Sequence, residues 1–148
     1  MQAWSPYLSK DIDGMERVQR RATKMINGYK LLNYDSRLEK TGLITLEKRR
    51  ERGDLIQVFK LIKGFDDVDY KEFFTLAADT KTRGHKYKIV KARSRLTVRQ
   101  NFFSNRVVNG WNGLPEWVVD AETVNGFKNR LDTFWSMGSV DNELQSGF

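Results

Sequence analysis

The chain contains two kinds of side chain that suit acid–base or metal chemistry, which are clustered carboxylates and one histidine. Asp66 and Asp67 are adjacent and Asp69 follows closely, and paired carboxylates can hold two Mg²⁺ ions for in-line phosphoryl transfer. The cluster follows Gly64 and precedes a short aromatic segment, so helix capping and turn formation explain it more simply. His85 has no nucleophile or orienting carboxylate near it in sequence, so a surface or hydrogen-bonded histidine is favoured over a general base.

The sequence offers little else to a metal ion or a redox group. It contains no cysteine and only one histidine, which excludes a thiolate metal site and a disulfide framework. We therefore expect no catalytic residue, no metal site and no cofactor in this chain.

Residues 80–115 are strongly basic. They hold nine of the 26 Lys and Arg residues and no Asp or Glu, which leaves 17 basic and 19 acidic residues elsewhere. The formal net charge of +7 is therefore concentrated here. This favours a polyanionic partner, because cations that neutralise phosphates release counterions. Tyr87 and Phe102 lie among these cations and could stack on the bases of a single strand. The candidate nucleic-acid-binding residues of this stretch are Lys86, Lys88, Arg93, Arg95 and Arg99.

A second basic row is expected on the first predicted helix, residues 10–26. Arg17, Arg20, Arg21 and Lys24 are spaced at i, i+3, i+4 and i+7, which places them on one side of a helix. Such a row can grip a phosphate backbone, so Arg20, Arg21 and Lys24 are further candidate contacts. The alternative is an ordinary solvated face. The buried stripe of this helix is expected to consist of Ile12, Met15, Ala22, Met25 and Ile26.

Hydrophobic periodicity predicts a mainly α-helical fold with a short β-strand or hairpin element in the middle. Residues 86–89 alternate charged and apolar side chains, as strands do. We expect residues 1–136 to form a single helical domain and residues 137–148 to form a disordered tail. After the first helix, the helices are expected at residues 34–40, 46–63, about 70–76, about 100–111 and from 124 to about 135.

Several short motifs occur along the chain in an order and spacing that carry a family resemblance. They include Trp4-Ser5-Pro6-Tyr7-Leu8, Val18-Gln19-Arg20-Arg21-Ala22-Thr23-Lys24, Leu43-Ile44-Thr45-Leu46-Glu47, Thr82-Arg83-Gly84-His85, Asn101-Phe102-Phe103, Arg106-Val107-Val108-Asn109 and Phe127-Lys128-Asn129-Arg130-Leu131-Asp132. From residue 2 to about 135, the chain resembles the region that follows the polymerase core in reverse transcriptases of LINE-type, jockey-like non-LTR retrotransposons. The aromatic-Ala-Asp-Asp metal site of that family does not occur in these residues.

The resemblance implies a non-catalytic C-terminal region of an RNA-directed DNA polymerase. Such a region would contact template RNA or an RNA–DNA hybrid through its basic surface, so that RNA, DNA or both are the expected partners. Upstream palm and thumb domains are further implied partners, and Trp4 and Tyr7 are the candidate interface with them. Two alternatives remain open, which are a structural domain that packs on the thumb without touching nucleic acid and a relic of a truncated element.

The location of the protein is expected to be intracellular, either nuclear or cytoplasmic. No targeting signal is seen, and no apolar run approaches the roughly 20 residues that span a bilayer, so no membrane association is expected.

Overall fold

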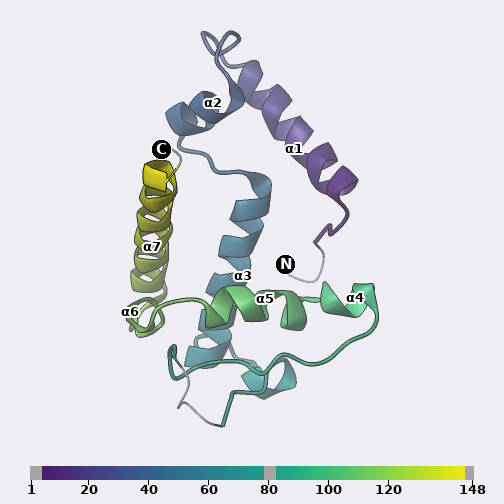
Figure 1. Cartoon of the computed structure of the whole chain (residues 1–148), viewed down its shortest axis with the longest axis vertical. Coiled ribbons are helices and arrows are strands. Elements are labelled where there is room, and N and C mark those ends of the chain that lie inside the picture. The colour runs from purple at the N-terminus through teal and green to yellow at the C-terminus, as the bar shows by residue number, and fades with distance from the viewer. Residues whose placement is uncertain (1–4, 79–82, 146–148) are drawn as a thin grey trace.

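Helices make up most of the structure. The structure, a computed structural model, describes residues 5–78 and 83–145 (Figure 1). The predicted mainly α-helical fold is confirmed. The elements in chain order are α1 (Ser9–Lys24), α2 (Tyr34–Thr41), α3 (Leu46–Lys63), the 3₁₀ turn η1 (Tyr70–Glu72), α4 (Thr97–Gln100), α5 (Phe103–Asn112), α6 (Glu116–Val119) and α7 (Val124–Gln145).

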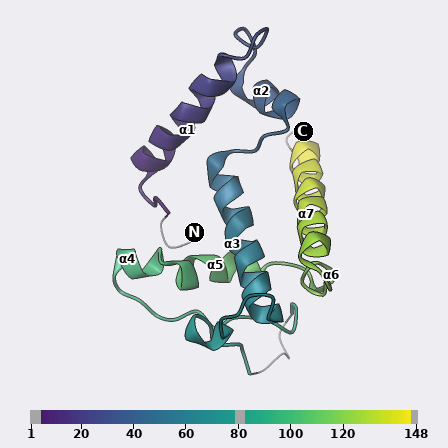
Figure 2. The same ribbon diagram turned by 180° about the vertical axis from the view of Figure 1, so that it is seen from behind.

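Helix α3 is the central element of the fold. Figure 1 and the reverse view in Figure 2 show α7 beside it, α5 crossing its C-terminal half, and α1 leaning away from it on the side opposite α7. The short helix α2 joins α1 to the start of α3. No helix in the described residues is both long enough and apolar enough to cross a membrane.

The ends of α3 follow from local sequence signals. The Thr45 side chain accepts a hydrogen bond from the backbone N–H of Lys48 at 3.3 Å, which satisfies one of the free N–H groups of the first turn. Gly64 ends the helix with φ +74°, in the left-handed region that favours glycine. The sequence predicted this helix closely because both signals lie next to it in the chain.

The core lies where α3, α5 and α7 meet. Phe59, Trp111 and Phe127 are completely buried, one from each helix. The rings of Phe59 and Phe127 stack with their centroids 4.3 Å apart, an arrangement that adds to the free energy of area burial. Leu55 and Leu131 complete the centre of the cluster. These contacts fix α5 across α3, and α5 in turn positions the segment that precedes it.

The predicted strand at residues 86–89 is reduced to a single antiparallel bridge between Leu76 and Ile89. The backbone N–H of Ala77 donates to the carbonyl of Lys88 at 2.8 Å. On its other edge, Ile89 meets a side chain instead of a further strand, because the Asn112 amide accepts from the Ile89 N–H and donates to its carbonyl. An amide at the end of α5 thus takes the place of a strand, and the ladder stops there.

His85 anchors the same segment to α5. Its side chain is buried, and its Nδ1 accepts from the backbone N–H of Tyr87, so that Nε2 carries the proton and donates to the carbonyl of Trp111 at 2.9 Å. The Trp111 indole N–H returns a bond to the carbonyl of Tyr87 at 2.7 Å. The histidine is hydrogen-bonded on both ring nitrogens, as the sequence interpretation favoured, and holds residues 85–89 against the core.

The burial of His85 makes the stability of the fold depend on pH. Burial lowers the pKa of this imidazole in the folded chain. Its stabilising contribution is therefore complete above the unfolded pKa of about 6.5 and declines as the pH falls below that value, because the unfolded chain then binds the proton first. We expect the Tm of the wild type to fall more steeply than that of H85Q between about pH 7.5 and pH 5. Parallel Tm curves for the two proteins would contradict this assignment.

The buried face of α1 differs from the predicted stripe. Ile12 and Met15 are half-buried, but Ala22, Met25 and Ile26 are exposed, and the helix ends at Lys24. The inward face is polar, and its buried members are Glu16 and Thr23. Leu8 is the N-cap residue.

The polar face of α1 is stabilised by groups that lie far away in sequence. Glu16 accepts from the Tyr34 hydroxyl and, at 2.9 Å, from the backbone N–H of Leu46 at the start of α3. Thr23 accepts from Nε of the buried Arg37 at 3.2 Å. Helix α1 packs on α2 and on the start of α3 through these polar groups. Ala22, Met25 and Ile26 therefore stay at the surface.

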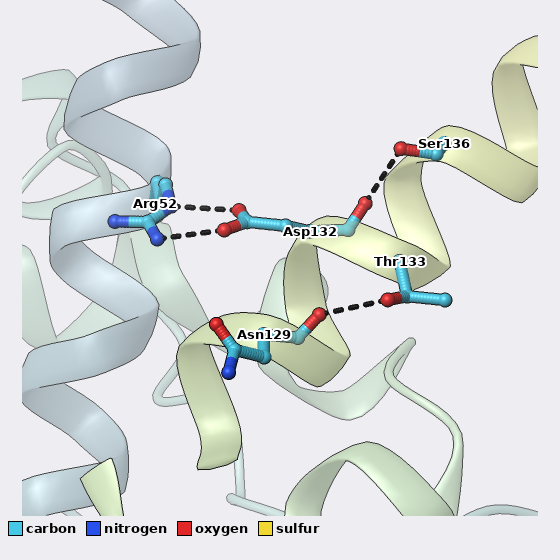
Figure 3. A network of polar contacts seen from close by, with 5 residues as sticks. All are labelled: Arg52, Asn129, Asp132, Thr133 and Ser136. Carbon is cyan, nitrogen blue, oxygen red and sulfur yellow. Dashed lines mark hydrogen bonds and ion pairs between the residues drawn. The ribbon is translucent and has the colours of Figure 1, made fainter. Parts of the chain in front are cut away.

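Helix α7 is tied to α3 by a bidentate ion pair. Both nitrogens of the Arg52 fork lie 2.8 Å from the Asp132 carboxylate (Figure 3). Figure 3 also shows Ser136 and Thr133 donating to backbone carbonyls one turn earlier in α7, at 2.9 Å each. These bonds lie just before the point where the sequence predicted the domain to end.

Beyond that point the helix continues to Gln145, through most of the segment predicted as a disordered tail. Residues 137–145 are therefore helical where the sequence predicted disorder, and residues 146–148 lie outside the described range. The physical reason is that extending an existing helix costs far less than nucleating one, so mixed polar composition does not stop it.

Candidate nucleic-acid interface

A basic groove lies between the Ile89 bridge and α5. It has a volume of about 750 Å³ and lies in the part of the chain that runs in an open arc to α4 (Figure 1). None of the described residues that line it is acidic. The residues that line it are Lys91, Ala92, Arg93, Ser94, Arg95, Gln100 and Asn105.

The wall of this groove is shaped by a break between α4 and α5. The sequence predicted one helix over residues 100–111, but Asn101 and Phe102 interrupt it, and Phe102 adopts an extended conformation with ψ 148°. The Asn101 side chain donates to the carbonyl of Thr97 at 2.8 Å, and the buried Asn105 donates to the carbonyl of Arg99 at 2.8 Å. The Asn105 amide thus gives the carbonyl of Arg99 a partner in place of the Phe103 N–H of a continuous helix, whereas the carbonyl of Thr97 keeps its bond from the Asn101 backbone N–H at 3.1 Å.

A second set of bonds holds the arc itself. The Gln100 amide donates to the carbonyl of Ser94 at 2.8 Å, and the Ser94 hydroxyl donates to the carbonyl of Leu96 at 3.2 Å. These contacts fold residues 94–100 into a tight bend. The cations on either side of the bend are therefore held on a defined backbone.

The groove cations are exposed and form no ion pair with any acidic residue that the structure describes. Lys91, Arg93 and Arg95 are all exposed, as is Arg99 on α4. Within residues 5–78 and 83–138, the ion pairs join Arg52 to Asp132, Lys86 to Asp120 and Arg106 to Asp54, so that none involves a groove cation. Clustered cations without counter-charges give a local positive potential that attracts phosphates.

Arg106 belongs to the basic stretch but plays a structural part. Its Nε lies 2.8 Å from the Asp54 carboxylate of α3, and its Nη2 lies 3.0 Å from the other oxygen. Both side chains are largely buried. Arg106 also donates to the carbonyl of Asn101 at 3.3 Å, at the break between the two helices. The pair therefore attaches the base of the groove to α3.

Lys86 and Lys88 lie on the anchored segment and outside the groove lining. Lys86 pairs with Asp120 at 2.9 Å on the surface. This hydrogen bond raises the pKa of Lys86 and lowers the pKa of Asp120. The Lys88 ammonium donates to the backbone carbonyl of Arg83. Of the five candidates in the basic stretch, only Arg93 and Arg95 line the groove, with Arg99 next to it.

The basic row of α1 is exposed as predicted, but the structure does not bring it to the groove. Arg17, Arg20, Arg21 and Lys24 all face solvent, and the guanidinium of Arg20 lies 5.0 Å from the centre of the Tyr34 ring. Figures 1 and 2 both place the C-terminal half of α1 next to α2, at the opposite end of the molecule from α4. The two basic regions are thus separate surfaces.

The acidic cluster after α3 is occupied by structural contacts. Asp66 accepts from the Gln57 amide at 2.5 Å, and Asp69 caps η1 by accepting from the N–H of Lys71. Within the described part of the chain, no three His, Cys, Asp or Glu residues are placed to hold a metal ion.

Of the two candidate interface residues, the structure describes Tyr7 but not Trp4. Tyr7 is exposed just before α1 and lies beside a small hollow that Pro6, Glu47 and Arg106 also line. Trp4 lies outside the described residues.

Sequence reasoning selected only Arg93 and Arg95 among the residues that line the groove. Lys91 was counted in the basic stretch but not selected, and Gln100 and Asn105 were assigned only to a helix. The available signal was the amides Gln100, Asn101 and Asn105 between Arg99 and Arg106, because such amides often bond backbone carbonyls where regular structure breaks.

No protein-family model matches the sequence, and searches of curated proteins and of solved structures found no significant match.

Proposed function

We propose that this chain is a non-catalytic nucleic-acid-binding domain of the kind implied for the C-terminal region of a LINE-type reverse transcriptase. The observation that carries the proposal is the basic groove, with its exposed cations Lys91, Arg93 and Arg95 and no acidic residue among the described residues that line it. Phosphate backbones are the natural ligands of such a surface, because each neutralised phosphate releases condensed counterions. The proposed ligand is template RNA or an RNA–DNA hybrid.

Binding of labelled RNA tests this proposal directly. Fluorescence anisotropy of the purified chain with a labelled RNA strand, an RNA hairpin and a hybrid duplex near physiological salt is expected to give a Kd of about 1 μM or tighter for at least one of them. A folded protein that leaves all three unbound contradicts the proposal.

A second candidate function is a structural role in which the domain packs on a polymerase thumb. Apolar side chains exposed near and along α1 favour it, and Met25 is 81% exposed. A contact with another domain would cover such residues. The others are Tyr7, Leu8, Val18 and Ile26. Under this alternative, substitution of Tyr7 and Val18 by serine releases the chain from a co-expressed palm–thumb domain and leaves RNA binding unchanged.

A further inference from the structure

Exposed apolar side chains lie next to the groove residues in sequence. Leu96 and Val98 are 73% and 72% exposed, and the ring of Phe102 is 49% exposed. All three lie between groove residues in sequence, because Arg95 precedes Leu96 and Asn105 follows Phe102. The neighbouring Phe103, by contrast, is buried in the core. Leu96 and Val98 at α4 and Phe102 at the helix break are therefore apolar side chains held at the surface, and Phe102 lies between the groove residues Gln100 and Asn105.

This combination of charges and apolar groups discriminates between forms of nucleic acid. A duplex presents phosphates on its outside and keeps its base faces stacked inside, so apolar side chains gain little from it. A single strand presents phosphates and base faces together, and proteins that bind single strands combine a cationic groove with rings on which bases stack. We propose that the groove selects single-stranded RNA or DNA over duplex, with the phosphates on Lys91, Arg93 and Arg95 and a base on Phe102.

The backbone around Phe102 supports this role. Phe102 stands at the break between α4 and α5 in an extended conformation, which holds its ring outside both helices. The hydrogen bond from the Arg106 guanidinium to the carbonyl of Asn101 holds the backbone at the break. A ring held in place in this way loses little conformational entropy when a base stacks on it.

An anionic membrane is the other surface that combines negative charge with apolar material. The hollow shape of the groove argues against it, because a bilayer is flat and contacts protruding side chains, whereas a strand can lie in a groove of about 750 Å³. Anionic vesicles are therefore included in the test as the alternative ligand.

The inference rests on the proposed nucleic-acid binding, and the experiment separates the two. Labelled RNA and DNA strands of about 12 nucleotides, the corresponding duplexes, and vesicles of anionic phospholipid are titrated with wild type, F102A and F102W. Wild type is expected to bind the strands at least about tenfold more tightly than the duplexes. The F102A variant is expected to lose about 5- to 150-fold in strand affinity, which corresponds to one stacked base, while its duplex affinity and its salt slope stay unchanged.

Two matched variants test whether the loss of strand affinity in F102A is due to the ring of Phe102. F102W retains a stacking face and is expected to bind strands at least as tightly as wild type. W117A removes an equally exposed ring from α6, which Figures 1 and 2 place at the other end of α5 from α4, and is expected to bind as wild type.

Two outcomes would overturn the inference. Equal affinity for strand and duplex, with no effect of F102A, would leave a groove that contacts phosphates alone, and the proposed function would stand. Binding of vesicles that F102A weakens, without binding of any oligonucleotide, would overturn the inference and the proposed function together.

Discussion

Reversal of the three groove cations is expected to weaken RNA binding strongly without unfolding the chain. The triple variant K91E/R93E/R95E removes three contacts to phosphates and places three carboxylates in their path. Hydrogen bonds to charged groups contribute about 1.5–3 kcal/mol each, so we expect a loss of at least 100- to 1,000-fold in affinity. The side chains are exposed and take no part in the core, so the Tm is expected to change little. Anisotropy titration and thermal melting measure the two quantities.

The control for this variant carries the same change of charge elsewhere. Lys30, Lys40 and Lys71 are exposed lysines that belong to neither predicted interface. The variant K30E/K40E/K71E also lowers the formal net charge from +7 to +1, and it is expected to retain most of the affinity. If both triple variants lose affinity equally, net charge and not the groove determines binding.

Loss of the Asp54 carboxylate is expected to be the most destabilising single polar substitution near the groove. The D54A variant leaves the guanidinium of Arg106 largely buried without its carboxylate. Breaking a buried ion pair from one side costs about 3–5 kcal/mol, because the remaining charge is no longer compensated. Urea unfolding followed by tryptophan fluorescence measures this loss.

The double variant D54A/R106M serves as the reference for that measurement. It replaces the whole pair with apolar groups, which proteins often tolerate with little loss of stability, so it is expected to be more stable than D54A alone. RNA binding by the folded double variant is expected to be weaker than that of wild type, because Arg106 no longer holds the carbonyl of Asn101 at the helix break. If the free energy of unfolding of D54A lies within about 1 kcal/mol of that of wild type, the ion pair is not what holds α5 against α3.

The parts of the fold that could be predicted depend on neighbouring residues. The start and end of α3 follow from Thr45 and Gly64, which act on the backbone beside them. The core positions Phe59, Trp111 and Phe127 follow from helical periodicity, because each of their helices presents one apolar face to the centre.

The parts that could not be predicted depend on contacts between distant residues. The apolar residues of α1 were assigned inward, but Glu16 is the residue that turns inward, since its partners Tyr34 and Leu46 lie 18 and 30 positions away. The strand at Ile89 stops because the Asn112 amide, 23 positions later, takes its hydrogen bonds. Periodicity contains no information about such partners.

Charge pointed to the candidate site in the sequence, but it did not show which cations line the groove. Three cations of the basic stretch, Lys91, Arg93 and Arg95, line the groove, and their part in binding stays a prediction. Charge alone did not separate these cations from Arg106, which pairs with Asp54, or from Lys86, which pairs with Asp120. Which cations share one surface depends on the helix break after Gln100. Hydrogen bonds from the side-chain amides of Asn101 and Asn105 stabilise that break, and the sequence alone does not show them.

The salt dependence of RNA binding tests the central claim most directly. Affinity for a labelled single strand is measured by anisotropy across a series of salt concentrations, for wild type and for K91E/R93E/R95E. Each phosphate contact on a single strand contributes about −0.7 to the slope of log K against log salt, so the slope is expected to become shallower by about 2 in the variant. A wild-type affinity that does not change with salt, or a slope that the triple variant leaves unchanged, would contradict the assignment of this groove as a phosphate-binding surface.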